Sequence, residues 1–427
     1  MKTVAFQDRA FQATYRKVVR RLSVGTTDVW GVVHGILDDV RKRGDAALLQ
    51  HTLKFDRVRL TPATLRIPRE ATRSAYRQAD ASVVESLKYA AARITAFHEK
   101  QKSTHGSPLR KGGTYLAQRT HPIERVGLYV PGGTAAYPSS VLMNAIPARV
   151  AGVPRRMICS PAPDGVMNPY LLVAADIAGV DEIYQIGGAQ AIAAMAYGTR
   201  TIPKVDKIVG PGNRYVAEAK RQVYGEVGID MIAGPSELLI IADETAHPPY
   251  VASDLLSQAE HDEAAVVIFL TPSRKLAEAV RGEMKTQLAG LPRKTIAAAA
   301  LKNHGVTFIV PDLQTAIEMA NTIAPEHLSL FVTEPFAYLD QIRNAGSVFL
   351  GEMTPQALGD YIAGPNHVLP TGGAARFSSP LSVDDFVKKS SVIAYTRKAL
   401  RRDGPHLIRI AEMEGLAAHA NMVKIRL

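Results

Sequence analysis

Six polar side chains in the second half of the sequence have the residue types needed for metal-assisted acid–base chemistry. They are Gln258, His261, Glu326, His327, Asp360 and His419. Imidazole and oxygen ligands together suit zinc or another first-row divalent ion. A carboxylate next to an imidazole, as in APEHLSL, provides a general base and a proton carrier near neutral pH. If these side chains converge, the chemistry is metal-assisted and needs no thiol.

Each of these residues taken alone also has a simpler interpretation. Gln258 and His261 stand three residues apart on one face of a predicted helix, where a polar surface would give the same pattern. Glu326–His327 follows a predicted helix and could be an exposed dipeptide. Asp360 lies in a glycine-bounded loop and could be a solvated turn residue. Spacing alone therefore leaves both interpretations open.

Glycines and prolines cluster after three predicted strands. The runs are VPGGTAAYPSS (130–140), IGGAQAIAA (186–194) and VGPGNRY (209–215). Ligands of open parallel sheets bind beyond the carboxyl ends of the strands, where glycine lets the backbone approach them. Any one run could be a tight turn, but three in succession, with Gln190 and Asn213 at helix starts, favour a cofactor cleft. GxGxxG and P-loop patterns are absent, so the pattern does not name the cofactor.

The composition indicates a soluble protein of two or more domains. The chain has 427 residues, 46% of them hydrophobic, and a single cysteine. Cys159 excludes an internal disulfide, and its place in the predicted strand RMICS favours buried packing. The sequence shows no signal peptide and no apolar run long enough for a bilayer, which predicts a cytoplasmic protein with no membrane association.

The charge balance raises the question of nucleic-acid binding. The net charge is +11, with basic runs at Arg16–Arg21 and Arg397–Arg402. Neither run contains interleaved aromatic residues, and no zinc-finger or RNP pattern is present. These runs are therefore interpreted as solvated surface, and no nucleic-acid partner is expected.

Strands and helices alternate after a helical first hundred residues. RVGLYV, RMICS, EIYQIG, KIVG, ELLIIA, AVVIFL, VTFIV and SVFLG are short β-rich runs with helical patterns between several of them, which predicts an α/β fold with parallel sheets. We expect a helical region over 1–113, partly packed on the second α/β unit, and α/β units over 114–234 and 235–381. The tail, 382–427, is expected to end in one amphipathic helix.

Taken together, the longest of these strings resemble the histidinol dehydrogenase family. The resemblance runs through RVGLYVPGGTAAYPSSVLMNAIPA, KIVGPGNRYVAEAKRQV, ASDLLSQAEHD, APEHLSL, GDYIAGPNHVLPTGGAARFSSPLSV and EGLAAHA. It spans most of the chain from about Glu124 to His419. It implies a zinc enzyme that oxidises L-histidinol to L-histidine in two NAD-dependent steps through an aldehyde. It also implies two incomplete Rossmann-like domains, with helical N- and C-terminal segments that mediate homodimer formation.

The resemblance further implies a role for each site residue. The zinc ligands, one ion per subunit, would be Gln258, His261, Asp360 and His419. Glu326 and His327 would be the acid–base pair. Substrate would be held by these six residues together with Ser236, His367 and Glu414. NAD would contact Tyr129, Gln190 and Asn213. Because tails are exchanged in this family, His419 would come from the partner subunit.

Other functions remain possible at this point. Relatives with the same fold and zinc set could oxidise other small alcohols. A zinc hydrolase would use Glu326 to activate water without a nicotinamide, although it would not need the three glycine turns. A basic nucleic-acid-binding protein would require steeply salt-dependent DNA affinity.

Overall fold

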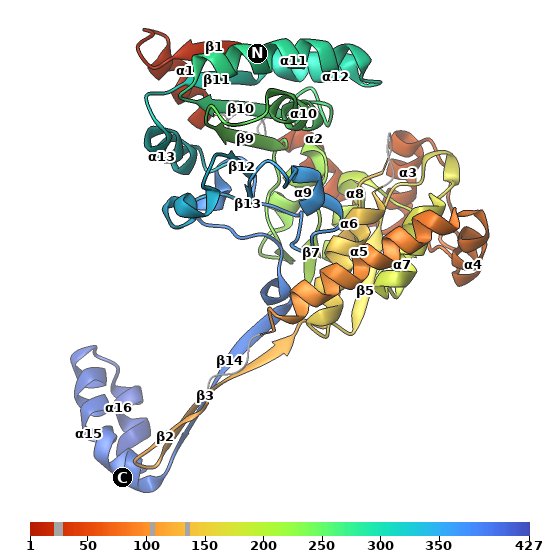
Figure 1. The fold of residues 1–427 in the computed structure, drawn as a ribbon. Helices are drawn as coiled ribbons and strands as arrows, with labels where there is room; N and C mark the ends of the chain where they lie inside the picture. Colours follow the sequence, from red (N-terminus) through yellow and green to blue (C-terminus); the bar gives the residue numbers. More distant parts are fainter. Residues whose placement is uncertain (21–28, 103–106, 133–136) are drawn as a thin grey trace.

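The computed structural model describes residues 1–20, 29–102, 107–132 and 137–427. It contains two α/β units and a long arm that carries the C-terminal helices away from them (Figure 1). No helix in the described ranges is long and apolar enough to cross a lipid bilayer. The mixed α/β class with parallel sheets is as predicted. The glycine-turn residues 133–136 and Arg21 of the first basic run lie outside the described ranges.

The first unit is built on a five-stranded parallel sheet with the strand order β6-β5-β4-β7-β8. Its strands are β4 (Arg125–Tyr129), β5 (Arg155–Cys159), β6 (Glu182–Tyr184), β7 (Lys207–Val209) and β8 (Gly228–Ile229). Its helices are α6 (Pro138–Val150), α7 (Pro169–Ala178), α8 (Gly188–Tyr197) and α9 (Arg214–Val223). After β4 the chain adds β5 and β6 on one side of that strand and then adds β7 and β8 on its other side. Open parallel sheets bind ligands where the strand order changes direction in this way.

The second unit repeats this strand order in a six-stranded sheet, β1-β11-β10-β9-β12-β13, in which all pairs are parallel. Its strands are β1 (Lys2–Ala5), β9 (Glu237–Ala242), β10 (Val266–Thr271), β11 (Gly305–Ile309), β12 (His327–Phe331) and β13 (Ser347–Leu350). Its helices are α10 (Pro248–Ala259), α11 (Arg274–Gly290), α12 (Lys294–Asn303), α13 (Leu313–Ile323) and α14 (Gln356–Tyr361).

Both faces of the second sheet are covered by helices. Leu238 and Ile240 of β9 pack with α10, α11 and α12, whereas Leu239 and Ile241 pack on the opposite face. That opposite face is covered by α13 and by α1 (Phe11–Val19). Every residue of β9 and β10 is buried, and both strands are apolar except for Glu237 at the start of β9 and Thr271 at the end of β10, as expected for a covered parallel sheet.

The N-terminal region is divided between the two units. β1 and α1 extend the second unit, and Phe11 packs edge-on against Phe308 of β11. The remaining helices pack on the first unit. They are α2 (Trp30–Arg43), α3 (Asp45–Asp56), α4 (Arg69–Gln78) and α5 (Ala81–Glu99). The prediction of a wholly helical start was therefore wrong at β1, a four-residue strand without strong periodicity.

The C-terminal tail differs most from its prediction. A three-stranded antiparallel sheet forms the arm, from β2 (Leu109–Lys111), β3 (Thr114–Pro122) and β14 (Val387–Tyr395). Two helices follow it, α15 (Arg397–Met413) and α16 (Ala417–Lys424), where one helix was expected. Gly415, at a φ of 75°, separates them, a conformation that glycine adopts without strain. Figure 1 shows both helices at the far end of the arm.

Candidate active site

Glu326 and His327 are held together at the amino end of β12. The backbone of Glu237, at the start of the neighbouring β9, binds both: its N–H donates to Glu326 Oε2 at 2.7 Å, and its carbonyl oxygen lies 2.9 Å from His327 Nδ1. Both side chains are buried. As expected, the pair follows a helix, since α13 ends at Ile323, but His327 begins a strand and neither side chain is exposed. The two adjacent side chains do lie close together, with 3.6 Å between Glu326 Oε2 and His327 Nδ1.

Burial and nearby charges set the protonation of this pair. Burial raises the pKa of the Glu326 carboxyl to about 7, against the opposing effect of His327. Burial lowers the pKa of His327, but the carboxylates of Glu326 and Asp360 outweigh it and raise the pKa to about 9. His327 Nε2 has no hydrogen-bond partner among the described residues and lies 3.7 Å from Asp360 Oδ1. The pair can therefore exchange protons near neutral pH.

Two of the expected metal ligands, His261 and Asp360, lie near this pair. Gln258 is fully buried on α10. The prediction that His261 lies on the same helix was wrong, because α10 ends at Ala259, two residues before His261. Asp360 lies on α14 and not in a loop. The charge of Asp360 acts on both His327 and His261, which places the three groups near one another. Desolvation by the surrounding protein lowers the pKa of the His261 imidazole.

His367 joins the second unit to the first. Its Nδ1 lies 2.8 Å from the Asp360 carbonyl oxygen, and its Nε2 lies 3.3 Å from Ser140 Oγ on α6. The next residue back, Asn366, donates from Nδ2 to the Met143 carbonyl oxygen at 2.6 Å. Ser236 directly precedes Glu237 at the start of β9. The amino edge of the second sheet thus meets the end of the first unit where α6 begins.

The three expected cofactor residues lie at the carboxyl edge of the first sheet. Tyr129 ends β4, and its hydroxyl accepts the Gly188 N–H at 3.0 Å. Gln190 is buried on α8, and its Nε2 has no partner among the described residues. Asn213 is exposed and caps α9 by accepting the backbone N–H groups of Tyr215 and Val216. A Cβ at Gly210 would lie 2.1 Å from the Tyr129 carbonyl oxygen, which explains the glycine there.

Glu414 and His419 are not brought to this site by their own chain. Glu414 directly follows α15, His419 lies on α16, and both side chains are exposed. The two helices lie at the end of the arm, away from the α/β units (Figure 1). Among the described residues no group of three His, Cys, Asp or Glu side chains could hold a metal ion.

Several polar residues around the site were not predicted. Lys220 and Asp230 form a buried ion pair that binds Gly210 on both sides: Asp230 Oδ2 accepts its N–H at 2.8 Å, and Lys220 Nζ donates to its carbonyl oxygen at 2.9 Å. Asp254 and Gln356 are buried beside Gln258. The sequence held one signal for the last two, because each precedes an expected ligand, Gln258 or Asp360, by four residues on a helix.

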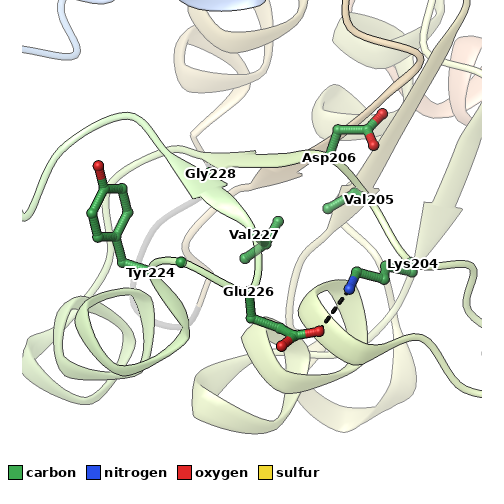
Figure 2. A pocket seen from close by; sticks show the side chains of 8 residues that line it. Lys204, Val205, Asp206, Tyr224, Glu226, Val227 and Gly228 are labelled. Atoms are coloured by element: carbon green, nitrogen blue, oxygen red, sulfur yellow. Dashed lines mark hydrogen bonds and ion pairs between the residues drawn. The ribbon is translucent and has the colours of Figure 1, made fainter. Parts of the chain in front are cut away.

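A cavity of about 380 Å³ lies elsewhere, at the amino edge of the first sheet (Figure 2). It is lined by Lys204, Asp206 and the turn Tyr224–Gly228, and Lys204 Nζ pairs with Glu226 Oε1 at 2.7 Å across it. The glycine turns lie at the opposite edge of this sheet. The cavity is therefore separate from the candidate active site.

Comparison with known proteins places residues 19–427 within the family described as histidinol dehydrogenase. The chain is 51% identical to a histidinol dehydrogenase of Geobacter metallireducens, covering 100% of this chain and 98% of the relative. It is 53% identical to a Bacillus cereus histidinol dehydrogenase, with coverages of 92% and 91%. Its structure is similar to the crystal structure of histidinol dehydrogenase from Elizabethkingia anophelis, with a TM-score of 0.94, 38% identity and coverages of 100% and 98%.

Proposed function

We propose, since the chain belongs to the histidinol dehydrogenase family, that it oxidises L-histidinol to L-histidine through L-histidinal, with NAD and one zinc ion per subunit. Family membership makes it an oxidoreductase of histidine biosynthesis. The cofactor, the metal, the two-step course and a cytoplasmic location are the finer parts of the proposal. The observation that carries them is the buried Glu326–His327 pair beside Asp360 and His261.

The donor atoms around this pair fit zinc. An amide oxygen, an imidazole and a carboxylate from Gln258, His261 and Asp360 would supply three ligands, and His419 of the partner subunit would supply the fourth. The unpartnered, buried Nε2 atoms of Gln258 and His327 support a ligand site here. A zinc ion bound to Asp360 would also offset part of the negative charge that raises the pKa of His327. The neutral imidazole, which can accept a proton, would then be favoured.

The glycine turns of the first unit fit NAD. Gly210 and Gly188 both have positive φ, and a Cβ at either would lie within 2.6 Å of another atom, so the backbone there is open only to glycine. Gln190 offers an unpartnered donor, and Asn213 places a helix start beside it. The order shared by the five strands of the first sheet and by β9 to β13 of the second supports two incomplete Rossmann-like domains, over 114–234 and 235–381, with segments 1–113 and 382–427 beside them.

His327 and Glu326 would move the protons of both oxidations. When bound, NAD supplies the hydride acceptor and zinc supplies positive charge that stabilises an alkoxide oxygen. His327 takes the hydroxyl proton at Nε2, since Nδ1 is held by the Glu237 carbonyl oxygen. Glu326, whose pKa is raised by burial to about 7, activates the water that hydrates the aldehyde. Cys159 is fully buried in the sheet and takes no part.

The substrate and the partner subunit complete the proposal. Ser236, His367 and the acid–base and metal-site residues would hold the amino alcohol and its imidazole, with Glu414 added by the partner subunit. Exposed apolar side chains on α15 and α16 support a homodimer in which tails are exchanged, because such a surface normally packs against another chain. They include Ile410, Met413, Met422 and Ile425.

The NADH yield tests the reaction. We expect two NADH for each histidinol consumed, together with about one zinc per subunit by elemental analysis. One NADH per substrate, or efficient oxidation of a different alcohol without histidinol turnover, would contradict the proposal. The zinc hydrolase alternative predicts no effect of NAD on thermal stability, whereas a bound cofactor raises the melting temperature.

A further inference from the structure

Three buried polar side chains meet where α10 packs against the start of α14. Asp254 and Gln258 lie one helical turn apart on α10, and Gln356 is the first residue of α14. Gln356 Nε2 donates to Gln258 Oε1 at 2.9 Å, and the Gln356 backbone N–H lies near the Asp254 carboxylate. Their exposures are 8%, 0% and 4%, so each must find its hydrogen-bond partners within the protein.

Each of the three side chains has one buried atom without a partner. These atoms are Asp254 Oδ2, Gln258 Nε2 and Gln356 Oε1. A buried polar atom left unpaired destabilises the folded state, so three in one cluster need an explanation. The three are two acceptors and one donor, and the donor, Gln258 Nε2, bonds to neither acceptor. The cluster therefore contains hydrogen-bond donors and acceptors that could pair with one another, but in the present arrangement they do not.

Rotating the side-chain amides of Gln258 and Gln356 by half a turn allows these donors and acceptors to pair. The oxygen and nitrogen of an amide are nearly equal in size, so the rotation exchanges donor and acceptor and changes the packing little. Gln258 Nε2 then donates to Gln356 Oε1 in place of the present bond between the same two amides. Gln356 Nε2 is then free to donate a hydrogen bond within the cluster, where Asp254 Oδ2 lacks a donor. Gln258 Oε1 takes the place of the unpartnered Gln258 Nε2.

We propose that Gln356 and Asp254 are positioning residues that hold the Gln258 amide with its oxygen, and not its nitrogen, toward a divalent metal ion. The inference rests on the proposed role of Gln258 as a metal ligand. A neutral amide binds a metal through its oxygen, so an amide that points its nitrogen inward cannot serve. Outer partners that orient a ligand typically change metal affinity 10- to 100-fold when removed. Because α14 also carries Asp360, the same short helix supplies one ligand and orients another.

Zinc affinity of the purified full-length chain, measured by competition with a chromogenic chelator, tests this arrangement. Gln356→Met removes the acceptor, and we expect zinc affinity to fall about 10- to 100-fold. Gln356→Glu keeps an acceptor and loses the donor, so Gln258 must turn its Nε2 toward residue 356, and zinc affinity should stay within about threefold of the parent. The double variant Asp254→Asn/Gln356→Glu keeps one carboxylate in the pair and should also bind zinc like the parent.

Gln222→Met is the matched control, because Gln222 also has a buried Oε1 without a partner but lies on α9. Its zinc affinity should equal that of the parent, and the melting temperatures of all variants in EDTA separate zinc loss from misfolding. Unchanged zinc binding in Gln356→Met overturns the inference. So does equal loss in Gln356→Met, Gln356→Glu and the double variant, since the donor of Gln356 would then be the group that matters. A parent chain that binds no zinc contradicts the proposed function itself.

Discussion

His327 is fixed by Glu237, whose carbonyl oxygen lies 2.9 Å from His327 Nδ1. A carbonyl oxygen only accepts, so Nδ1 carries a proton and Nε2 is the atom of the ring that can gain or lose one. Nε2 is buried, has no hydrogen-bond partner among the described residues and faces Asp360. The strand pairing of β9 and β12 thus decides which nitrogen can act on a substrate.

Replacing His327 by Gln should slow turnover without emptying the site. The substitution removes the proton acceptor but none of the proposed metal ligands, so zinc content and NAD affinity should match the parent. We expect kcat to fall about 10²- to 10⁴-fold, the usual effect of losing a general base. Elemental analysis, NAD titration and steady-state kinetics check the three parts. Loss of zinc in this variant would mean that His327 is a ligand.

The strands found from the sequence were those with the simplest burial. ELLIIA and AVVIFL are buried along their whole length, and the only polar residue in either, Glu237, stands at the first position and leaves the apolar run uninterrupted. HLSLF was missed because a histidine and a serine interrupt its apolar pattern, although the structure buries all five residues. The arm strands β3 and β14 were missed because most of their residues are exposed or half-buried, so neither strand has a core-facing pattern.

The sequence predicted only part of the candidate site, and the reason is again physical. The family motifs named its residues, but the contacts between them depend on packing that no local pattern encodes. Asp360 was assigned to a loop because glycines flank it, whereas the structure forms a short helix there. Gln356 and Lys220 occupy ordinary helix positions in the sequence, and only the fold shows that Gln356 is buried against Gln258 and Lys220 against the Gly210 turn.

Cys159 should be silent in both oxidations. It is fully buried at the end of β5, and burial raises the pKa of its thiol, so it is a poor nucleophile in the folded chain. We expect the native protein to resist iodoacetamide and to become labelled only after unfolding. Cys159→Ala should keep the yield of two NADH per histidinol. A yield of one in this variant would assign the second oxidation to the thiol.

The Lys220–Asp230 pair should matter for both stability and the Gly210 turn. Both side chains are almost fully buried, and they bind the two sides of the Gly210 peptide. Lys220→Met leaves Asp230 as an unpaired buried charge, which typically costs about 3–5 kcal/mol in the free energy of unfolding. NAD affinity should weaken as the turn loosens.

Chemical denaturation and NAD titration measure both effects of Lys220→Met. The double variant Lys220→Met/Asp230→Asn removes the unpaired charge and should recover part of the stability. Lys204→Met breaks the exposed Lys204–Glu226 pair in the same unit and serves as the control, with little expected effect. Equal destabilisation by Lys204→Met and Lys220→Met would show that burial of the pair is not the cause.

Exchange of tails between subunits should let two inactive variants restore each other. His261→Asn and His419→Asn each remove one proposed zinc ligand, so each homodimer should lose zinc and activity together. In a mixed dimer, a site formed by the body of one chain and the tail of the other combines either both substitutions or neither. One of its two sites is therefore intact if His419 acts in the partner subunit. If His419 served its own chain, every site in the mixed dimer would carry one substitution.

The amount of restored activity distinguishes these arrangements. After unfolding and refolding an equal mixture, half of the dimers are mixed, and each has one intact site of two. We therefore expect about a quarter of the parent activity, with a matching share of bound zinc. The control mixture combines His261→Asn with Asp360→Asn, whose ligands both lie in the body of the chain, and it should stay inactive. Activity in the control, or none in the test mixture, would contradict a site completed by His419 of the partner subunit.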